Sequence, residues 1–311
     1  MKRLIQKIVI FLLLLFAAAI PLQNISDRAI RSFNKNGWAD IYDSKINADI
    51  IIQGNSRAQN NILPTILDSV LKTNSYNLGI GGFQFFMQYY RFLVYMKHNK
   101  APKYIIQNVD NMTISKQVDF IEYTQFLPYF NDSLVKEEIQ SFGLFDWRAF
   151  YIPYYKYIGN FDVAYQGLTN CFTPFTDSTR KYKGFIPMPR RPNSLPFKYT
   201  LLNSTPARTE IDTATLRLFT RFLDLCKKNK TQVILVFTPY YYLETKKYLN
   251  MDSVIWIFRK YSTQYNIPFL DYRNDSICFD SLNFANPHHL NMAGAKKFSR
   301  KLAYDLKSIL K

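Results

Sequence analysis

Short apolar segments alternate along the chain with longer segments of helical hydrophobic pattern, and this alternation constrains the fold more than any other feature. The segment "ADIIIQG", which ends at Gly54, is typical of a buried strand, and a helical pattern follows it. Continuous apolar strands between helices indicate a mostly parallel sheet that helices cover on both faces. The expected strands are residues 49–54, 75–82, 102–110, 231–239 and 267–272, and the expected helices are residues 62–71, 83–99, 209–228, 252–265 and 291–310.

Residues 112–206 interrupt this alternation and are rich in Tyr, Phe and Pro, as in "WRAFYIPYYKYIGNF". We interpret them as an insertion that lies over the ends of the strands. Two roles stay open for it, a cap that binds substrate and a purely structural excursion. The chain of 311 residues is long enough for one large domain or two small ones.

The N-terminus carries an uninterrupted apolar run, "IVIFLLLLFAAAIPL", which basic residues precede in "MKRLIQK". The run predicts a membrane anchor or, with cleavage at the alanines of residues 17–19, a signal peptide. The basic residues favour a cytoplasmic N-terminus, so the remainder is expected outside the cytoplasmic membrane, single-pass if anchored and secreted or periplasmic if cleaved. The expected parts are a membrane segment at residues 1–23, a stem at 24–47 and a folded domain at 48–311.

The formal net charge is +17, and the basic residues are spread along the chain. There is no arginine-rich arm, zinc-finger spacing or RNA-binding signature, so nucleic acid is not expected as a partner. An anionic membrane surface or an acidic polymer suits this charge. The 23 Tyr and 26 Phe residues suit surfaces that contact sugars or other molecules.

No metal or other cofactor is expected. Cys171, Cys226 and Cys278 lie far apart without a CxxC spacing, so they give no metal signal and leave one disulfide open. His288 and His289 are too close in sequence to be two ligands of one zinc ion, and no HExxH pattern occurs. The glycine-rich "GIGG" lacks the Walker and GxGxxG forms of nucleotide sites.

A serine and a histidine stand where a sheet of this type would bring them together. Ser56 directly follows the first expected strand, and His289 lies between the fifth expected strand and the last helix. Catalytic loops gather outside the carboxyl ends of parallel strands, so the two side chains are expected to meet. A serine hydroxyl is a weak nucleophile at neutral pH and needs such a base.

Four short blocks occur in order at suitable spacing: "GNSRA", "YNLGIGG", "NVDN" and "NPHHLNMAGAKKFS". Together they resemble the SGNH/GDSL hydrolases. They are most similar to the membrane-anchored, extracytoplasmic branch that includes the D-alanyl-transfer protein of the teichoic-acid system and the acetyltransferases of exopolysaccharide export. The resemblance covers residues 48–111 and 209–311 and leaves out the insertion. It implies a three-layer α/β/α, flavodoxin-like sheet of five mostly parallel strands.

The resemblance also implies roles for individual residues. Ser56 matches the nucleophile, and its backbone N–H matches one donor to the oxyanion. Gly82 matches the second donor, with Gly79 and Gly81 as close rivals. His289 matches the base.

The fourth block departs from the family pattern at the residue that orients the histidine. Asn286 stands where the family has Asp, so an amide accepts the hydrogen bond from the ring but carries no charge to stabilise the imidazolium. Three alternatives stay open: Asn286 itself orients the ring, Asp280 or Asp271 supplies the carboxylate, or Ser56 and His289 act as a dyad.

The third block departs from the pattern as well. It has Asp110 and then Asn111 where the family has Asn and then Asp. A carboxylate repels an oxyanion, so either Asn111 is the third donor or the third donor is lost. Asp110, Arg57 and His288 are candidates for binding substrate, and a structural salt bridge is the equal alternative for Arg57.

Two functions from different classes follow. The first is an extracytoplasmic serine esterase or O-acyltransferase that acts on acyl esters of cell-envelope glycans, in some cases with a membrane-bound acyl-transfer partner. The second is a catalytically inactive protein of the same fold that binds a polysaccharide or scaffolds an export or modification complex. The reactivity of Ser56 separates the two.

Overall fold

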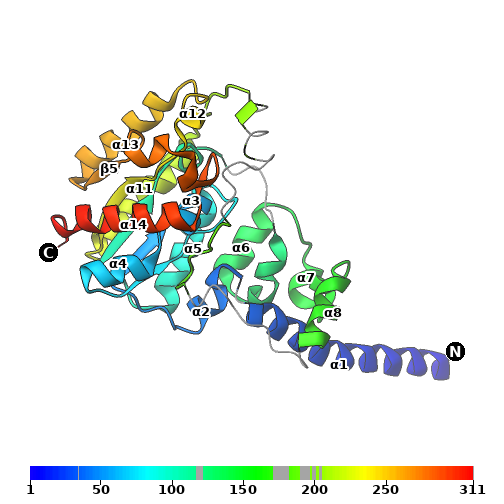
Figure 1. Cartoon of the computed structure of the whole chain (residues 1–311). Helices are drawn as coiled ribbons and strands as arrows, with labels where there is room; N and C mark the ends of the chain where they lie inside the picture. Colours follow the sequence, from blue (N-terminus) through cyan, green and yellow to red (C-terminus); the bar gives the residue numbers. More distant parts are fainter. Residues whose placement is uncertain are drawn as a thin grey trace. The chain divides into compact units, whose positions relative to one another are not determined.

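The computed structural model describes residues 1–33, 35–116, 122–170, 182–189, 197, 201–202 and 205–310 (Figure 1). The chain forms two compact units, and each is described by itself. Unit 1 consists of Met1–Ala39 and Phe120–Asp177, and unit 2 consists of Asp40–Asp119 and Ser178–Lys311.

Unit 2 is built on a five-stranded parallel sheet with the strand order β2-β1-β3-β4-β5. In this flavodoxin-like order the chain changes its direction across the sheet between β1 and β3. Ile52 of β1 pairs with Asn77 of β2 and with Ile106 of β3, which fixes the register at the centre. The predicted α/β fold class is thereby confirmed. The strands are β1 (Ile50–Gln53), β2 (Ser75–Asn77), β3 (Tyr104–Asn108), β4 (Gln232–Phe237) and β5 (Phe269–Asp271).

Helices cover both faces of this sheet. On one face α4 (Pro64–Leu71) and α14 (Met292–Lys307) share a buried cluster with Ile52 and Ile106. On the other face the helices pack against one another through aromatic rings. The ring of Phe219 lies 4.9 Å from that of Phe85 and 5.9 Å from that of Phe258, measured between centroids. These rings belong to α11 (Thr213–Lys228), α5 (Phe85–His98) and α13 (Met251–Tyr265), and the shorter helices of the unit are α3 (Ser56–Asn61) and α12 (Tyr242–Thr245).

A small antiparallel hairpin follows the sheet, which the sequence analysis did not predict. It consists of β6 (Phe284–Asn286) and β7 (His289–Leu290) and lies directly before α14. The hairpin matters because both of its strands carry residues of the candidate site. The 3-10 turns of unit 2 are η2 (Asn111–Thr113), η5 (Ser276–Phe279) and η6 (Ser281–Asn283).

Unit 1 begins with one long helix, α1 (Lys2–Phe33). An 18-residue window of α1 has a mean hydropathy of 2.4 and is 0% buried, so the helix is long and apolar enough to cross a membrane. Residues 24–33 continue this helix, which differs from the stem predicted for them. The reason is a buried stripe of Ser26, Ala29 and Ile30, which has the three- and four-residue spacing of a helix packed on one side.

The described part of the insertion contributes mainly to unit 1. Its helix α8 (Phe161–Asn170) packs along α1, and Trp38 of the N-terminal segment packs edge-on against Phe126 at 5.1 Å between ring centroids. Residues 182–189 belong to unit 2. The other elements at the N-terminus and in this part are η1 (Lys35–Gly37), α2 (Trp38–Tyr42), η3 (Tyr123–Tyr129), α6 (Ser133–Ser141), α7 (Arg148–Tyr151) and η4 (Tyr155–Tyr157).

Two of the cysteines are free thiols in the interior of unit 2. Cys226 and Cys278 are both buried, and burial raises the pKa of the Cys278 thiol to about 12. A disulfide between these two is therefore absent. Cys171 lies outside the described residues.

Candidate active site

Ser56 is the first residue of α3, immediately after the central strand β1. Gly54 connects the two with a φ of +149°, and a Cβ at this position would lie 2.8 Å from the Cβ of Asn108 on the neighbouring strand. Only glycine permits both the conformation and this close approach. Asn55 then caps α3, because its Oδ1 accepts a hydrogen bond from the backbone N–H of Arg57 at 2.9 Å. Ser56 is thus held at the carboxyl end of β1, beside the point where the strand order reverses.

His289 lies against Ser56 and completes a chain of three polar side chains. Its Nε2 is 2.8 Å from Ser56 Oγ, and its Nδ1 is 3.0 Å from Asn286 Oδ1. The backbone N–H groups of His288 and His289 also donate to Asn286 Oδ1, each at 3.0 Å. Three donors around one oxygen fix the orientation of the amide. Nδ1 of His289 therefore carries the hydrogen in the neutral ring, and Nε2 is free to accept the hydroxyl proton of Ser56.

Two further asparagines, which the sequence analysis did not assign to the site, hold the histidine hairpin in place. Asn61 on α3 accepts a hydrogen bond from the backbone N–H of Leu290 at 2.9 Å, so the serine helix is tied to the histidine strand. Asn291 caps α14 through Gly294 N–H at 3.0 Å and donates to the carbonyl of Phe284 at 3.2 Å. The sequence carried a signal for the second of these, since Asn291 and Gly294 belong to the "HLN..G" pattern of the last block.

Neither of the alternative carboxylates orients His289. Asp280 caps η6 by accepting from the backbone N–H of Leu282 at 2.9 Å. Asp271 pairs with Arg273, with 3.0 Å between Oδ2 and the guanidinium. Asn286 is the residue that contacts the ring.

The environment of His289 disfavours its charged form. Burial, followed by the positive charges of His288 and Arg57, lowers the pKa of His289 to about 3. An uncharged Asn286 offers nothing to offset these effects, whereas a carboxylate at this position would raise the pKa. The ring is therefore neutral at physiological pH, which is the protonation state of a general base, but it is a weaker base than an ordinary histidine.

This lowered pKa predicts an unusual dependence on pH. Because the base is active when neutral, the acylation rate with an uncharged ester is expected to stay constant as pH falls through 6.5, the ordinary value, and to drop only near 3. As pH falls, the imidazole of His289 takes up a proton at a higher pH in the unfolded chain than in the folded chain. The contribution of His289 to the free energy of unfolding is therefore complete above pH 6.5 and is lost as the pH falls toward 3. NMR titration of the imidazole resonances provides the measurement. A half-loss of rate near 6.5, with titration of His289 at the same pH, would contradict this prediction.

The glycine loop after β2 contacts Ser56 through Gly81. A Cβ at Gly81 would lie 3.6 Å from the Cβ of Ser56, whereas Gly79 packs on the backbone N of Gln59, 2.5 Å from where its Cβ would be. Gly82, which the family pattern matches to the oxyanion donor, is the next residue and is exposed with a φ of +79°. Gln59, which the sequence analysis did not assign to the site, ties the loop to α3 by donating to the carbonyl of Gly79 at 3.0 Å.

Arg57 and Asp110 form a buried ion pair under the site, at 3.2 Å between Nη1 and Oδ2. Their side chains are 3% and 0% exposed, and Asp110 also accepts from Asn55 Nδ2 at 2.8 Å. The guanidinium lies 3.4 Å from the centroid of the Tyr240 ring. Neither side chain is exposed, and for Arg57 the contact observed is the structural salt bridge; the role of the two side chains in binding substrate stays a prediction.

Asn111 is directed toward two tyrosines. Its Oδ1 accepts a hydrogen bond from the Tyr240 hydroxyl at 3.1 Å, and its side chain also hydrogen-bonds to Tyr248. The carbonyl oxygen of this amide is therefore occupied by a phenol, whereas an oxyanion donor would use the amide nitrogen. The role of Asn111 as third donor stays a prediction.

His288 is half-buried beside His289. Its Nδ1 is 3.7 Å from Glu244 Oε1, and its ring lies 6.1 Å from that of Tyr240 between centroids. Burial lowers the pKa of His288, which the nearby Glu244 carboxylate partly offsets. Of the three candidate substrate-binding side chains, His288 is the one that remains partly exposed.

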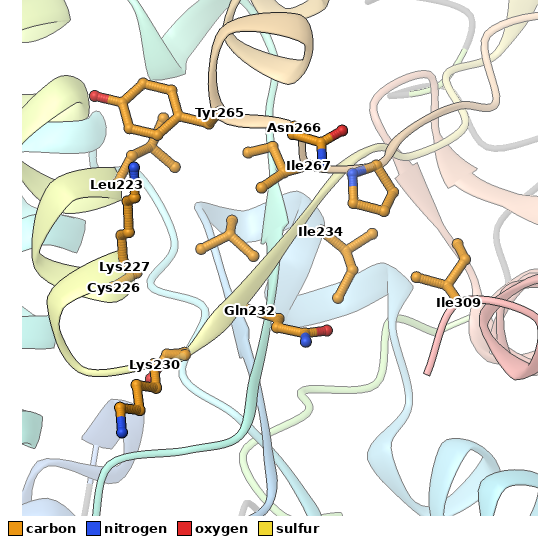
Figure 2. A pocket seen from close by; sticks show the side chains of 13 residues that line it. Leu223, Cys226, Lys227, Lys230, Gln232, Ile234, Tyr265, Asn266, Ile267 and Ile309 are labelled. Atoms are coloured by element: carbon orange, nitrogen blue, oxygen red, sulfur yellow. The ribbon is translucent and has the colours of Figure 1, made fainter. Parts of the chain in front are cut away.

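One cavity of unit 2 lies away from Ser56, and the described part of the chain carries no metal-binding cluster. Within that part, no group of three or more His, Cys, Asp or Glu residues could hold a metal ion. A cavity of about 570 Å³ lies at the amino ends of strands β4 and β5 (Figure 2). Its walls include Gln232 and Ile234 at the start of β4 and Ile267 just before β5, whereas the candidate site lies at the carboxyl ends of the strands.

Comparisons with known proteins find solved structures that match most of this chain, but with low TM-scores and low sequence identity. No family model matches the sequence, and no curated protein matches it. One similar solved structure is a protein described as lipolytic and of the G-D-S-L family from Desulfitobacterium hafniense, with a TM-score of 0.42 and 12% identity over 83% of this chain and 99% of that chain. Another is a protein described as an acylhydrolase from Bacteroides fragilis, with a TM-score of 0.37 and 12% identity over 82% and 86%. At these TM-scores the similarities do not assign an activity to this chain.

Proposed function

We propose that unit 2 is a serine ester hydrolase or acyltransferase, with Ser56 as nucleophile, His289 as base and Asn286 as the residue that orients the base. One observation carries this proposal: the unbroken series of contacts from Ser56 Oγ through His289 to Asn286, at 2.8 and 3.0 Å. A nucleophile, its base and a third group that orients the base are the arrangement that activates a serine.

The reaction runs in two halves. Ser56 Oγ attacks the ester carbonyl while its proton passes to His289 Nε2, and the carbonyl electrons move onto the oxygen, where the backbone N–H groups of Ser56 and of Gly81 or Gly82 stabilise the charge. The N–H groups of Gly79 and Ile80 already donate to Asn77 and to Gly54. Collapse expels the alcohol, which takes the proton back from Nε2. The acyl group on Ser56 then passes to water in a hydrolase or to a sugar hydroxyl in a transferase.

The proposed acyl acceptor or donor is a cell-envelope glycan, and the proposed location is the extracytoplasmic side of a membrane with α1 as a single-pass anchor. The length and apolar character of α1, the net charge of +17 and the many aromatic residues support this setting. An acyl-transfer partner in the same membrane would supply the donor in a transferase.

A second candidate is a protein of this fold that binds a polysaccharide and does not turn it over. Two observations favour it: the uncharged Asn286 at the base, and Asp110 buried in an ion pair at the position of a side-chain oxyanion donor. Both remove stabilisation from the charged intermediates of ester chemistry.

The first test is labelling of the full chain in detergent with a fluorophosphonate, a probe that reacts with activated serines. We expect Ser56→Ala to abolish labelling and His289→Ala to slow it by about 100-fold or more, since general base catalysis contributes about 10²- to 10⁴-fold. Ser308→Ala, at an exposed serine remote in sequence from the site, is the matched control and keeps the wild-type rate. A folded wild-type protein that does not react would overturn the enzyme proposal in favour of the binding protein.

A further inference from the structure

We propose that unit 1 docks on the lipid bilayer interface through a set of exposed, mostly aromatic side chains next to α1, so that the membrane contacts more than the anchor helix. We call this set the aromatic belt. Its members and their exposed fractions are Trp147 (63%), Tyr151 (67%), Ile158 (61%), Phe161 (71%) and Tyr165 (69%). The proposal concerns unit 1 and is independent of the chemistry of Ser56.

The exposure of α1 marks where the bilayer surface would lie. Residues 2–18 are exposed throughout, and from residue 19 onward unit 1 covers one side of the helix, with Ser26, Ala29 and Ile30 buried while residues 20, 21, 24, 28 and 32 stay exposed. At a rise of about 1.5 Å per residue, the 19 residues from Leu4 to Leu22 span about 28 Å, close to the hydrocarbon thickness of about 30 Å. The covered part of α1 therefore starts at the end of the membrane-spanning stretch.

The segments that carry the belt are fixed to α1 at this level. Gln23 Oε1, directly after the apolar run, accepts a hydrogen bond from the backbone N–H of Tyr154 at 2.7 Å. One turn later, Asp27 pairs with the buried Lys156 at 2.9 Å. These contacts hold η4 and its neighbouring residues against α1. They lie within about one helical turn of the predicted surface of the bilayer.

The belt residues lie on or next to elements that are close to these anchor points. Tyr151 lines a small cavity together with Gln23, which places it beside the end of the apolar run. Phe161 and Tyr165 are four residues apart on α8, so they share one face of a helix that packs along α1 (Figure 1). Trp147 directly precedes α7, which carries Tyr151.

The chemistry of the belt suits a lipid interface better than a protein surface. Trp and Tyr have an apolar body and a polar end, and they gather where acyl chains meet headgroups. A basic side chain accompanies them: Lys136 Nζ lies 2.7 Å from the Tyr151 hydroxyl, whereas Arg148 is already paired with Asp146 at 2.5 Å. A cation such as Lys136 is attracted to anionic headgroups. The belt is also continuous with a helix that the bilayer would already surround.

The test measures the depth of Trp147 in proteoliposomes that contain the full chain and lipids brominated on the acyl chain. The variant Trp256→Phe leaves Trp147 as the exposed tryptophan, and Trp147→Phe leaves Trp256, which is 62% exposed in unit 2 and serves as the matched control. The third tryptophan, Trp38, is 2% exposed and contributes the same background to both. Replacing an exposed ring by a smaller one leaves the fold intact in either variant.

We expect lipid brominated close to the headgroup to lower the Trp147 emission roughly twofold, more strongly than lipid brominated near the chain end, as for an aromatic side chain at the interface. Iodide in the aqueous phase should quench Trp147 less than Trp256. Equal quenching of both residues by bromine and by iodide would overturn the proposal. So would a Trp147 emission that responds only to a protein added to the vesicles, which would identify the belt as a protein-binding surface.

Discussion

Asn286→Asp is expected to accelerate ester turnover by at least about tenfold, with an upper range of about 10⁴-fold set by the loss seen when a triad Asp is changed to Asn. The carboxylate would still accept the hydrogen bond from His289 Nδ1, and it would add a negative charge 3.0 Å from the ring. That charge stabilises the imidazolium that forms during attack and raises the pKa of His289. The two backbone N–H groups that now donate to Asn286 Oδ1 would stabilise the carboxylate as well.

The measurement is the second-order rate of acylation by an activated ester, determined across pH for the wild type and the variant. Asn286→Ala is the control, because it removes the acceptor without adding charge, and it should slow acylation. The acid limb of the profile should move to higher pH in Asn286→Asp together with the faster rate. A variant that is folded and no faster than the wild type would show that the charge on this residue does not limit the reaction.

Asp110→Asn is expected to lower the free energy of unfolding of unit 2 by about 3–5 kcal/mol, the usual cost of breaking a buried ion pair on one side. Arg57 is 3% exposed, and after the substitution its charge faces only neutral partners, the Thr238 carbonyl and the Tyr240 ring among them. The effect is large because the charge that remains is buried, and not because the pair itself is strong.

Hydrogen exchange of the β1 and β3 amides is the suitable measurement, since it reports unit 2 separately from unit 1. Asp49→Asn is the matched control: its partner Lys103 lies 3.0 Å away, but the two side chains are 40% and 70% exposed, so the loss should be about 1 kcal/mol or less. The double variant Arg57→Met/Asp110→Asn should recover much of the loss. A loss in Asp110→Asn no larger than that in the control would contradict this account.

The sequence predicted the centre of the sheet well because β1, β3 and β4 are mostly buried on both faces and therefore form nearly unbroken apolar runs. β1 and β4 were found from Ile50–Ile52 and from the run ending at Phe237. The hairpin of β6 and β7 was not predicted, since strands of three and two residues are too short to show a period. The helical structure of residues 24–33 was also not predicted. Most residues of this segment are polar, and the helix is stabilised there by the tertiary packing of Ala29 and Ile30.

The candidate site was predictable where its residues lie shortly after the ends of strands. Ser56, His289 and Asn286 were found because one residue follows β1 directly and the others lie in a recognisable block before the last helix. The partners of Arg57 and Asn111 were not predictable, because Tyr240 comes from a loop after β4 that lies far away in sequence. The position of Gly81 against Ser56 depends on backbone geometry that "GIGG" does not encode by spacing alone.

The buried pair of Arg57 and Asp110 also limits how this chain can change over evolutionary time. An amide at position 110, as in the related pattern, is reached by one substitution, but that step leaves a cation buried without its counter-charge. Loss of Arg57 alone leaves an anion buried in the same way. The two positions are therefore expected to be epistatic: each residue makes the other difficult to replace, and a change at either position should be tolerated best when both change together.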